Sequence, residues 1–285
     1  MISLNNKNIK YYLLFGCDIS NQVYSSGYSL SDEERNMRSD TIILVILNTK
    51  TKKIKLVSIL RDICVDVKGH GKCKINSLIV YFGPKKTTKI IGNLLGIKIN
   101  KYITLNMKNM IEIIDLIGGI DVELSYEEID YINNMLLDST IVTQYQGNVN
   151  KLSEIGLNHL DGIQTLTHVR NRFYGYTWAR TKRQREVLIA IVKQIQNNVK
   201  PDQYIKLGLS MLKFVKTNLN IIDICQCAMI AKNIKINEIE TYSIPSTNTK
   251  SIKDDGLWRF EIDFKDANIY LQKIVNDEDV KDFVI

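Results

Sequence analysis

Four charged residues stand at the ends of three strand-like runs, and their types are those that bind metal ions and phosphate groups. Asp18 follows the apolar run 11–16, Asp40 precedes the β-branched run 41–47, and Arg61 and Asp62 follow the run 54–60. Apolar runs of this length, bounded by polar residues, are typical of buried strands. Carboxylates bind hard metal ions and a guanidinium binds phosphate. The sequence therefore predicts a metal and phosphate site where these strand ends meet.

The connections between the three runs decide whether the ends meet. Residues 48–53 form a polar link of hairpin length, so the second and third runs are expected to be antiparallel neighbours. The third run then ends beside the start of the second. If the first run is also antiparallel to the second, Asp18 lies at the same edge. The alternative is that Asp18 and Asp40 are ordinary turn residues and that Arg61 and Asp62 form an exposed pair.

A second group of basic residues lies further along the chain. Residues 159–170 are expected to form a helix, with Asp161 near its start to satisfy free backbone donors. A longer helix is predicted from Thr177, as its N-cap, to residue 199, where Pro201 stops it.

The first turns of the longer helix carry four basic side chains: Arg180, Lys182, Arg183 and Arg185. This charge has the wrong sign for the helix dipole, so a bound anion would explain it. Arg180 and Arg183 share a helix face with Gln184 adjacent, and Arg170 and Arg172 at the end of the preceding helix lie within reach. The alternative is a solvated basic face.

Six segments resemble the LytR-CpsA-Psr family in order and style. They are RSDTIILVILN, SILRDICVDV, KINS, LLGIKINKYITLNMKNMIEIIDLIGGIDVEL, LNHLDGIQTLTHVRNR and ARTKRQREV, and the resemblance extends over residues 11–275. It implies a three-layer α/β/α fold with a central mixed sheet flanked by helices. It also implies an Mg²⁺-dependent phosphotransferase that moves a glycopolymer, such as teichoic acid or capsule, from a polyprenyl pyrophosphate carrier onto a peptidoglycan hydroxyl.

The resemblance also implies roles for individual residues. Asp18 and Asp40 correspond to the metal ligands. The expected catalytic residues are Arg61, Asp62, Arg170, Arg172 and Arg180. The expected phosphate-binding residues are Arg38, Arg61, Arg170, Arg172, Arg180, Arg183 and Gln184. Phosphoryl transfer depends on positioning and electrostatic stabilisation, so no Ser-His or Cys-His nucleophile is required. The general base is left open between Asp62 and a metal-bound carboxylate.

Two departures from the family pattern bear on activity. Leu60 stands where the family commonly has Pro, and Thr177 stands where it commonly has Asp in an Asp-aromatic-Gly-Arg run. Two other functions stay open. One is a polyprenyl pyrophosphate hydrolase, with water as the acceptor. The other is a noncatalytic or regulatory protein that binds lipid-linked phosphates, which the Leu60 and Thr177 changes make harder to dismiss.

Composition agrees with an anionic partner. The net charge of +7 suits lipid phosphate, wall polymer or a membrane surface. No zinc-finger spacing, RNP-like run or helix-turn-helix pattern is present, so nucleic acid is not expected. No Pro-rich or Gly/Ser-rich linker divides the chain, and we expect one domain over residues 1–285, with a core at about 11–200 and a C-terminal portion at about 201–285.

The expected location is extracytoplasmic and membrane-associated, because the family normally carries an N-terminal membrane anchor. No run of eighteen apolar residues and no signal-peptide core is found. The sequence thus leaves open a truncated ectodomain and an atypical soluble member. The five cysteines have no disulfide-framework spacing and are expected to be free thiols.

The remaining elements are predicted from periodicity and capping signals. Helices are expected at 86–95, 108–117, 125–137, 203–215, 221–234 and 263–275, and strands at 102–107, 121–124 and 239–244.

Overall fold

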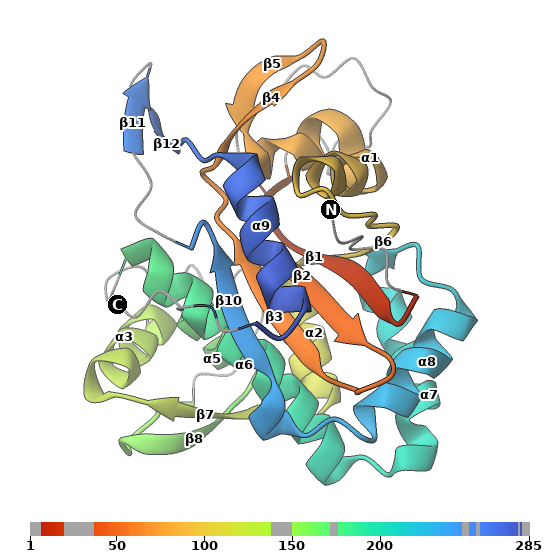
Figure 1. Ribbon diagram of the computed structural model, residues 1–285. Helices are drawn as coiled ribbons and strands as arrows, with labels where there is room; N and C mark the ends of the chain where they lie inside the picture. The colour runs from red at the N-terminus through yellow and green to blue at the C-terminus, as the bar shows by residue number, and fades with distance from the viewer. Residues whose placement is uncertain are drawn as a thin grey trace. The chain divides into compact units, whose positions relative to one another are not determined.

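The computed structural model describes residues 7–19, 37–137, 150–171, 176–246, 251–254, 257–278 and 280 (Figure 1). The chain forms two compact units. Unit 1 comprises Met1–Thr104, Lys216–Leu219 and Glu238–Ile285, and unit 2 comprises Leu105–Val215 and Asn220–Asn237. The single-domain organisation stays a prediction.

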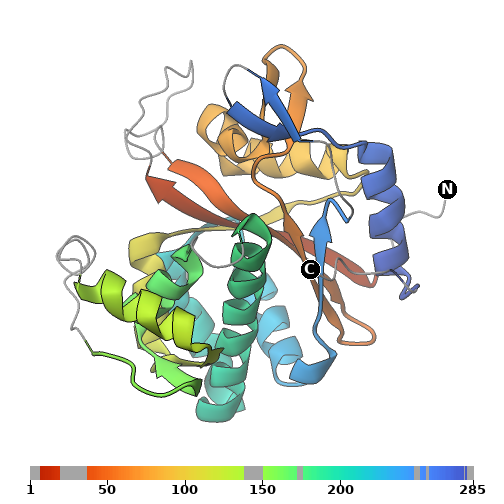
Figure 2. The ribbon, with the colours of Figure 1, turned by 90° about the vertical axis from the view of Figure 1, so that its left-hand side faces the viewer.

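Unit 1 is built on a six-stranded mixed sheet in the order β10-β3-β2-β1-β6-β9. Strands β1 and β2, red and orange, lie side by side in it (Figure 2). The strands are β1 (Ile9–Ile19), β2 (Met37–Asn48), β3 (Ile54–Ile59), β6 (Lys101–Asn106), β9 (Lys216–Thr217) and β10 (Glu240–Ile244). The β1–β2 and β2–β3 pairs are antiparallel, as predicted, while β10 runs parallel to β3. The predicted strand neighbours are therefore confirmed.

The middle parts of the central strands are buried. Leu13 and Phe15 of β1 and Ile42, Ile43 and Leu44 of β2 are almost completely buried. A continuous apolar strand of this kind needs cover on both faces, unlike an alternating strand with one wet face. The Asn48 side chain accepts hydrogen bonds from two backbone N–H groups of the following turn and so closes the β2–β3 hairpin.

Helix α1 (Leu78–Leu94) contacts β2, and α9 (Phe264–Val275) buries Ala267, Leu271 and Ile274 in the same unit. The α1 helix starts eight residues before the predicted segment and is kinked at Gly83, which has φ of 67° and precedes Pro84. Glycine and proline both disfavour a helix interior, so the sequence predicts a helix only after this kink. At α9, the buried Lys55 Nζ of β3 donates to the Ile274 carbonyl and pairs with Glu240 and Asp277. The α/β class, with a central mixed sheet flanked by helices, is confirmed.

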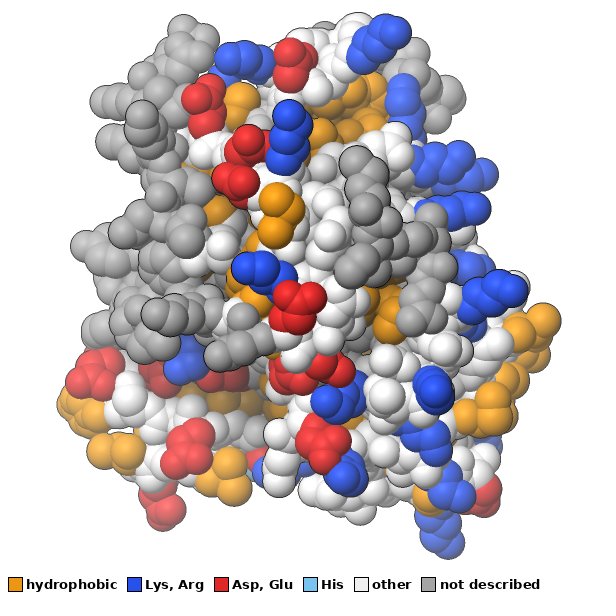
Figure 3. All heavy atoms as spheres, viewed as in Figure 1, with side chains coloured by type: hydrophobic (Ala, Val, Ile, Leu, Met, Phe, Trp, Pro, Cys, Tyr) orange, Lys and Arg blue, Asp and Glu red, His pale blue; other side chains and the backbone are white. Residues whose placement is uncertain are grey.

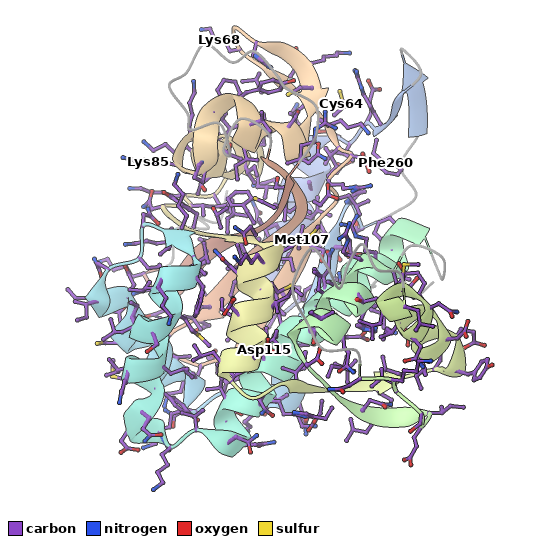
Figure 4. All side chains as sticks on the ribbon, turned by 180° about the vertical axis from the view of Figure 1, so that it is seen from behind. Cys64, Lys68, Lys85, Met107, Asp115 and Phe260 are labelled. Atoms are coloured by element: carbon purple, nitrogen blue, oxygen red, sulfur yellow. The ribbon has the colours of Figure 1, made fainter. Side chains whose placement is uncertain are left out.

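Two short hairpins complete unit 1, and neither was predicted. They are β4 (Cys64–Val67) with β5 (Gly71–Lys74), and β11 (Ser251–Asp254) with β12 (Leu257–Phe260). The segment after β3 meets β12 through a bridge between Ile63 and Phe260, and Figure 4 labels Phe260 and Cys64 at this junction.

Unit 2 is mainly helical. Its elements are α2 (Met107–Leu116), β7 (Ile120–Leu124), α3 (Tyr126–Leu137), β8 (Gly156–Leu160), α5 (Gly162–Arg170), α6 (Tyr176–Asn198), α7 (Tyr204–Met211) and α8 (Ile221–Ala231). Helix α5 contacts α2, α3 and α6, around a core that includes Ile114, Ile120, Ile132 and Leu160. A Cβ at Gly162 would lie 2.6 Å from the Ile111 carbonyl oxygen, so the start of α5 needs glycine there.

Several predicted boundaries in unit 2 are wrong. His159 and Leu160 belong to β8, where they pair with Asp121 and Ile120 in an antiparallel β7–β8 ladder that takes up their backbone groups. Asp161 is the N-cap of α5 and forms a capping box with Gln164, as its position suggested.

Other helix ends also differ from the predictions. Helix α6 begins at Tyr176, so Thr177 lies inside the helix and is not its N-cap. The predicted helix 203–215 ends as an α-helix at Met211 and continues as a short 3₁₀ turn, and α8 ends at Ala231. All five cysteines are free thiols, as expected. Along the described residues, no helix combines the length and apolar character needed to cross a membrane.

Candidate functional site

Asp40 occupies a bulge in the β1–β2 pair of unit 1. Gly16 is opposite Thr41 and Cys17 is opposite Ser39, so Asp40 is the extra residue on β2. A bulge of this kind turns a side chain away from the regular alternation of its strand. A Cβ at Gly16 would lie 2.9 Å from the Thr41 Cβ, so the strands can approach this closely only because residue 16 is glycine.

A chain of alternating charges links Asp40 to the end of β3. Arg61 Nη1 donates to Asp40 Oδ2 at 2.6 Å, and Arg61 Nε donates to Asp62 Oδ2 at 3.3 Å. Lys74 Nζ, at the end of β5, donates to Asp62 Oδ1 at 2.6 Å. The Arg61 side chain keeps 24% of its surface exposed, so the group is still open to a ligand. Asp40, Arg61 and Asp62 therefore meet as predicted, while their chemical roles stay predictions.

Backbone contacts fix the position of this network. The Arg61 carbonyl accepts from Asn76 N at 3.2 Å, and Ser39 Oγ donates to the Asn76 carbonyl at 3.3 Å. The Asp62 carbonyl accepts from Phe260 N at 2.9 Å. The KINS segment therefore fastens the residue after β3 to the start of β2.

Lys74 was missed as a site residue by the sequence reasoning, although the KINS motif that contains it was recognised. The contact with Asp62 depends on the β4–β5 hairpin, which brings residue 74 back to the end of β3. The only sequence signal was a lysine inside a recognised motif close to the Arg61-Asp62 pair.

Asp18 and Arg38 face each other across β1 and β2. Their Cα atoms are register partners, two positions from Asp40 on β2. The Asp18 side chain lies outside what the structure describes, and Arg38 is half-buried. Both aspartates thus lie on neighbouring strands at the same end of the sheet.

This donor set fits Mg²⁺. The ion takes oxygen ligands and often uses one or two carboxylates, with water and substrate phosphate completing its coordination. Asp18 and Asp40 would supply the carboxylates, and the ion pair with Arg61 uses Oδ2 of Asp40. Among the described side chains no cluster of three or more His, Cys, Asp or Glu residues that could hold a metal ion is present.

The basic residues of α6 in unit 2 are mostly buried. Arg180, Arg183, Gln184 and Arg185 each retain less than a tenth of their exposure, whereas Lys182 is exposed and pairs with Glu186. A solvated basic face is therefore wrong for the three arginines. Buried guanidinium groups need fixed partners.

Arg183 shows such partners. Its Nε donates to Glu128 Oε1 of α3 at 2.8 Å, and its Nη1 donates to the Asn171 carbonyl at 3.0 Å. These contacts tie α6 to α3 and to the end of α5. Arg170 is half-buried at the last position of α5, and Arg172 lies outside the described residues. The phosphate-binding roles of all these residues stay predictions.

His168 of α5 is a neutral group beside this ion pair. It is 1% exposed, and burial lowers its pKa to about 4, with Glu128 opposing and Arg183 reinforcing the effect. Neither ring nitrogen has a hydrogen-bond partner within the described part of the chain. Because the imidazole is neutral, it carries no charge that would compete with Arg183 for the Glu128 carboxylate.

Comparison with known proteins agrees with the resemblance seen in the motifs. The sequence model of the LytR_cpsA_psr family matches residues 2–274. Biofilm regulatory protein A of Streptococcus mutans is 28% identical over 224 residues, which are 74% of this chain and 52% of that protein. The polyisoprenyl-teichoic acid–peptidoglycan teichoic acid transferase TagU of Bacillus mycoides is 30% identical over 228 residues, 79% of this chain and 68% of that protein.

The chain therefore spans about half the length of the first relative and about two thirds of the second. A solved structure shows the same fold: the LytR-CPS2A-psr family protein YwtF (TagT) with bound octaprenyl pyrophosphate lipid. It matches with a TM-score of 0.65 and 23% identity, over 97% of this chain and 95% of that one. With the family match over nearly the whole sequence, the chain belongs to the LytR_cpsA_psr family.

Proposed function

We propose that this protein is a phosphotransferase that moves a glycopolymer from a polyprenyl pyrophosphate carrier onto a hydroxyl of peptidoglycan. The observation that carries the proposal is the Asp40–Arg61–Asp62–Lys74 network, partly exposed at the end of the sheet in a member of this family. The TagU relative is named a teichoic acid transferase, and the TagT structure holds a polyprenyl pyrophosphate lipid, which supports the same substrate class.

The reaction is a substitution at the phosphorus that carries the glycopolymer. The acceptor hydroxyl oxygen forms a bond to this phosphorus, and the bond to the bridging oxygen breaks. Polyprenyl phosphate leaves with the bridging oxygen, and the hydroxyl proton passes to a base. Charge that spreads over the phosphoryl oxygens is stabilised by positioned cations.

Arg61 is positioned to provide such a cation. Two carboxylates hold its guanidinium in one orientation, and the side chain remains partly exposed toward solvent. One oxygen of Asp62 accepts from Arg61 and the other accepts from Lys74. We therefore propose that Asp62 orients these two cations. Arg38, Arg170, Arg172 and Arg180 are proposed as further phosphate ligands.

Asp18 and Asp40 are proposed to hold Mg²⁺, which would neutralise pyrophosphate charge when bound. The proposed location is extracytoplasmic and at the membrane surface, where a polyprenyl carrier and peptidoglycan are both within reach. The net charge of +7 favours the approach of such anionic partners.

The test is turnover of a synthetic polyprenyl pyrophosphate-linked oligosaccharide by the purified chain, with peptidoglycan fragments and Mg²⁺ present. We expect release of polyprenyl phosphate and a mass-defined phosphodiester on the acceptor, both abolished by EDTA. Arg61→Ala is expected to lower the rate by at least about a hundredfold, as removal of a charge-stabilising donor does. Lys72→Ala, an exposed lysine of the same β5 strand, is the matched control and should keep the rate.

The products separate the alternatives. Glycan phosphate formed equally without acceptor would show a hydrolase and overturn the transfer step. Tight substrate binding with no product would show a noncatalytic binder. Unchanged turnover in Arg61→Ala would show that the Asp40–Arg61–Asp62–Lys74 network takes no part in the reaction.

A further inference from the structure

Helices α7 and α8 of unit 2 carry a group of exposed apolar side chains, here called the α7–α8 ridge. It consists of Ile205, Leu209, Ile221, Ile222 and Met229. Single exposed apolar residues are common on soluble proteins, but a contiguous group marks an interaction surface. Figure 3 shows hydrophobic side chains at the edge of the molecule over α8, with Lys or Arg side chains beside them.

The packing of the two helices explains why the ridge faces outward. A Cβ at Gly208 of α7 would lie 2.9 Å from Ile224 Cγ2 of α8, so the helices contact each other at this point. Ile224 and Ile230 supply the buried face of α8. Ile222 and Met229 are two helical turns apart on the opposite, exposed face, where they are 63% and 61% exposed.

The charge around the ridge is positive. Lys206, Lys213 and Lys232 are exposed, and none of the three pairs with a carboxylate in the part of the chain that the structure describes. Residues 201–235 contain five Lys and two Asp, with no Arg or Glu. One of the two aspartates, Asp223, accepts from Asn220 N in the capping box of α8.

We propose that the α7–α8 ridge docks on the surface of an anionic lipid bilayer. The apolar side chains would enter the interface while the lysines contact lipid phosphates, the arrangement of helices that lie on a membrane. The inference rests on the proposed function, because a polyprenyl-linked donor remains in the bilayer. A protein partner fits less well, since the cores of protein interfaces are depleted in lysine.

The experiment is co-sedimentation of the full chain with vesicles of phosphatidylcholine alone or of equimolar phosphatidylcholine and phosphatidylglycerol. We expect binding to the anionic vesicles, weakened by salt. The double variant Ile222→Glu with Met229→Glu should lower the bound fraction at least about tenfold, because each charge costs apolar insertion and adds repulsion. Ile155→Glu with Leu157→Glu, two other exposed apolar residues of unit 2, is the matched control and should bind as the unchanged chain does.

A second arm separates this inference from the proposed function. Turnover of a short, water-soluble polyprenyl pyrophosphate substrate should be the same in the ridge variant and the unchanged chain, whereas turnover of vesicle-embedded substrate should fall in the ridge variant alone. Soluble turnover without vesicle binding would overturn the docking surface and leave the function standing. Vesicle binding without any turnover would support the docking surface and overturn the proposed function. A concentration-dependent dimer that the ridge variant abolishes, with no vesicle binding, would assign the ridge to a second copy of the chain.

Discussion

The Asp40 carboxylate and the Arg61 guanidinium meet at 2.6 Å, joining the bulge of β2 to the segment that follows β3. The same guanidinium donates through Nε to Asp62. A planar group with separate nitrogens on two carboxylates has little freedom to rotate, so the cation is oriented before any ligand arrives.

Arg61→Lys tests this orientation. A lysine ammonium keeps the charge, but it is compact and cannot reproduce the fork that reaches Asp40 and Asp62 together. We expect turnover to fall by about a hundredfold with little change in the melting temperature. Lys72→Arg, the reverse exchange on β5, should leave the rate unchanged. A fully active Arg61→Lys would show that only charge is needed.

The Asp40–Arg61 contact could be predicted because hairpin length and apolar runs define the order of three strands. The bulge could not, since it depends on close packing of Gly16 against Thr41. Lys74 was missed because its approach to Asp62 requires a hairpin of two four-residue strands, too short for a periodic signal. Charge patterns also gave no sign that Arg183 is buried, because its partner Glu128 is supplied by a distant helix.

Glu128→Ala is expected to destabilise unit 2 by about 3–5 kcal/mol, because it leaves the buried Arg183 guanidinium without its carboxylate. Urea unfolding at neutral pH measures the change. Glu127→Ala removes an exposed carboxylate of the same turn that accepts a hydrogen bond from Ser125 Oγ, and it should lower the free energy of unfolding much less. Equal losses in the two variants would mean that the ion pair contributes nothing specific.

Gly119→Ala is expected to destabilise unit 2 by about 1–3 kcal/mol. Gly119 has φ of 88°, and a Cβ there would lie 2.4 Å from His159 Nε2. Gly156→Ala shares the positive φ but meets nothing within 4 Å, so it isolates backbone strain from the clash. Thermal unfolding should show the larger loss for Gly119→Ala, and the opposite order would contradict the described contact.

His168 is expected to make the protein sensitive to acid. Its folded pKa of about 4 lies below the ordinary value of 6.5, so below pH 6.5 the unfolded chain binds the proton more readily. Stability from this group is fully present above pH 6.5 and falls as the pH drops toward about 4. His168→Phe removes the titration and should flatten the urea-unfolding profile in this range. A urea-unfolding profile that keeps its slope in His168→Phe would contradict this role of His168.

His159 is expected to act in the opposite direction. Its Nδ1 lies 2.7 Å from Asp121 Oδ1 and its Nε2 lies 2.7 Å from the Gly118 carbonyl, so both nitrogens face acceptors. Only the imidazolium donates from both positions. The hydrogen bond to Asp121 raises the pKa of His159 above 6.5, with a smaller contribution from nearby Asp161.

Because the folded pKa of His159 is raised, its stabilising contribution is complete below pH 6.5 and is lost as the pH rises through the folded value. Its exposure keeps this contribution small. An NMR titration of the His159 ring should therefore give a pKa above 6.5 that falls in Asp121→Asn. Glu123→Gln, on an exposed residue of the same β7 strand, should leave it in place. If the pKa of His159 is unchanged in Asp121→Asn, the imidazolium does not join β7 to the end of α2.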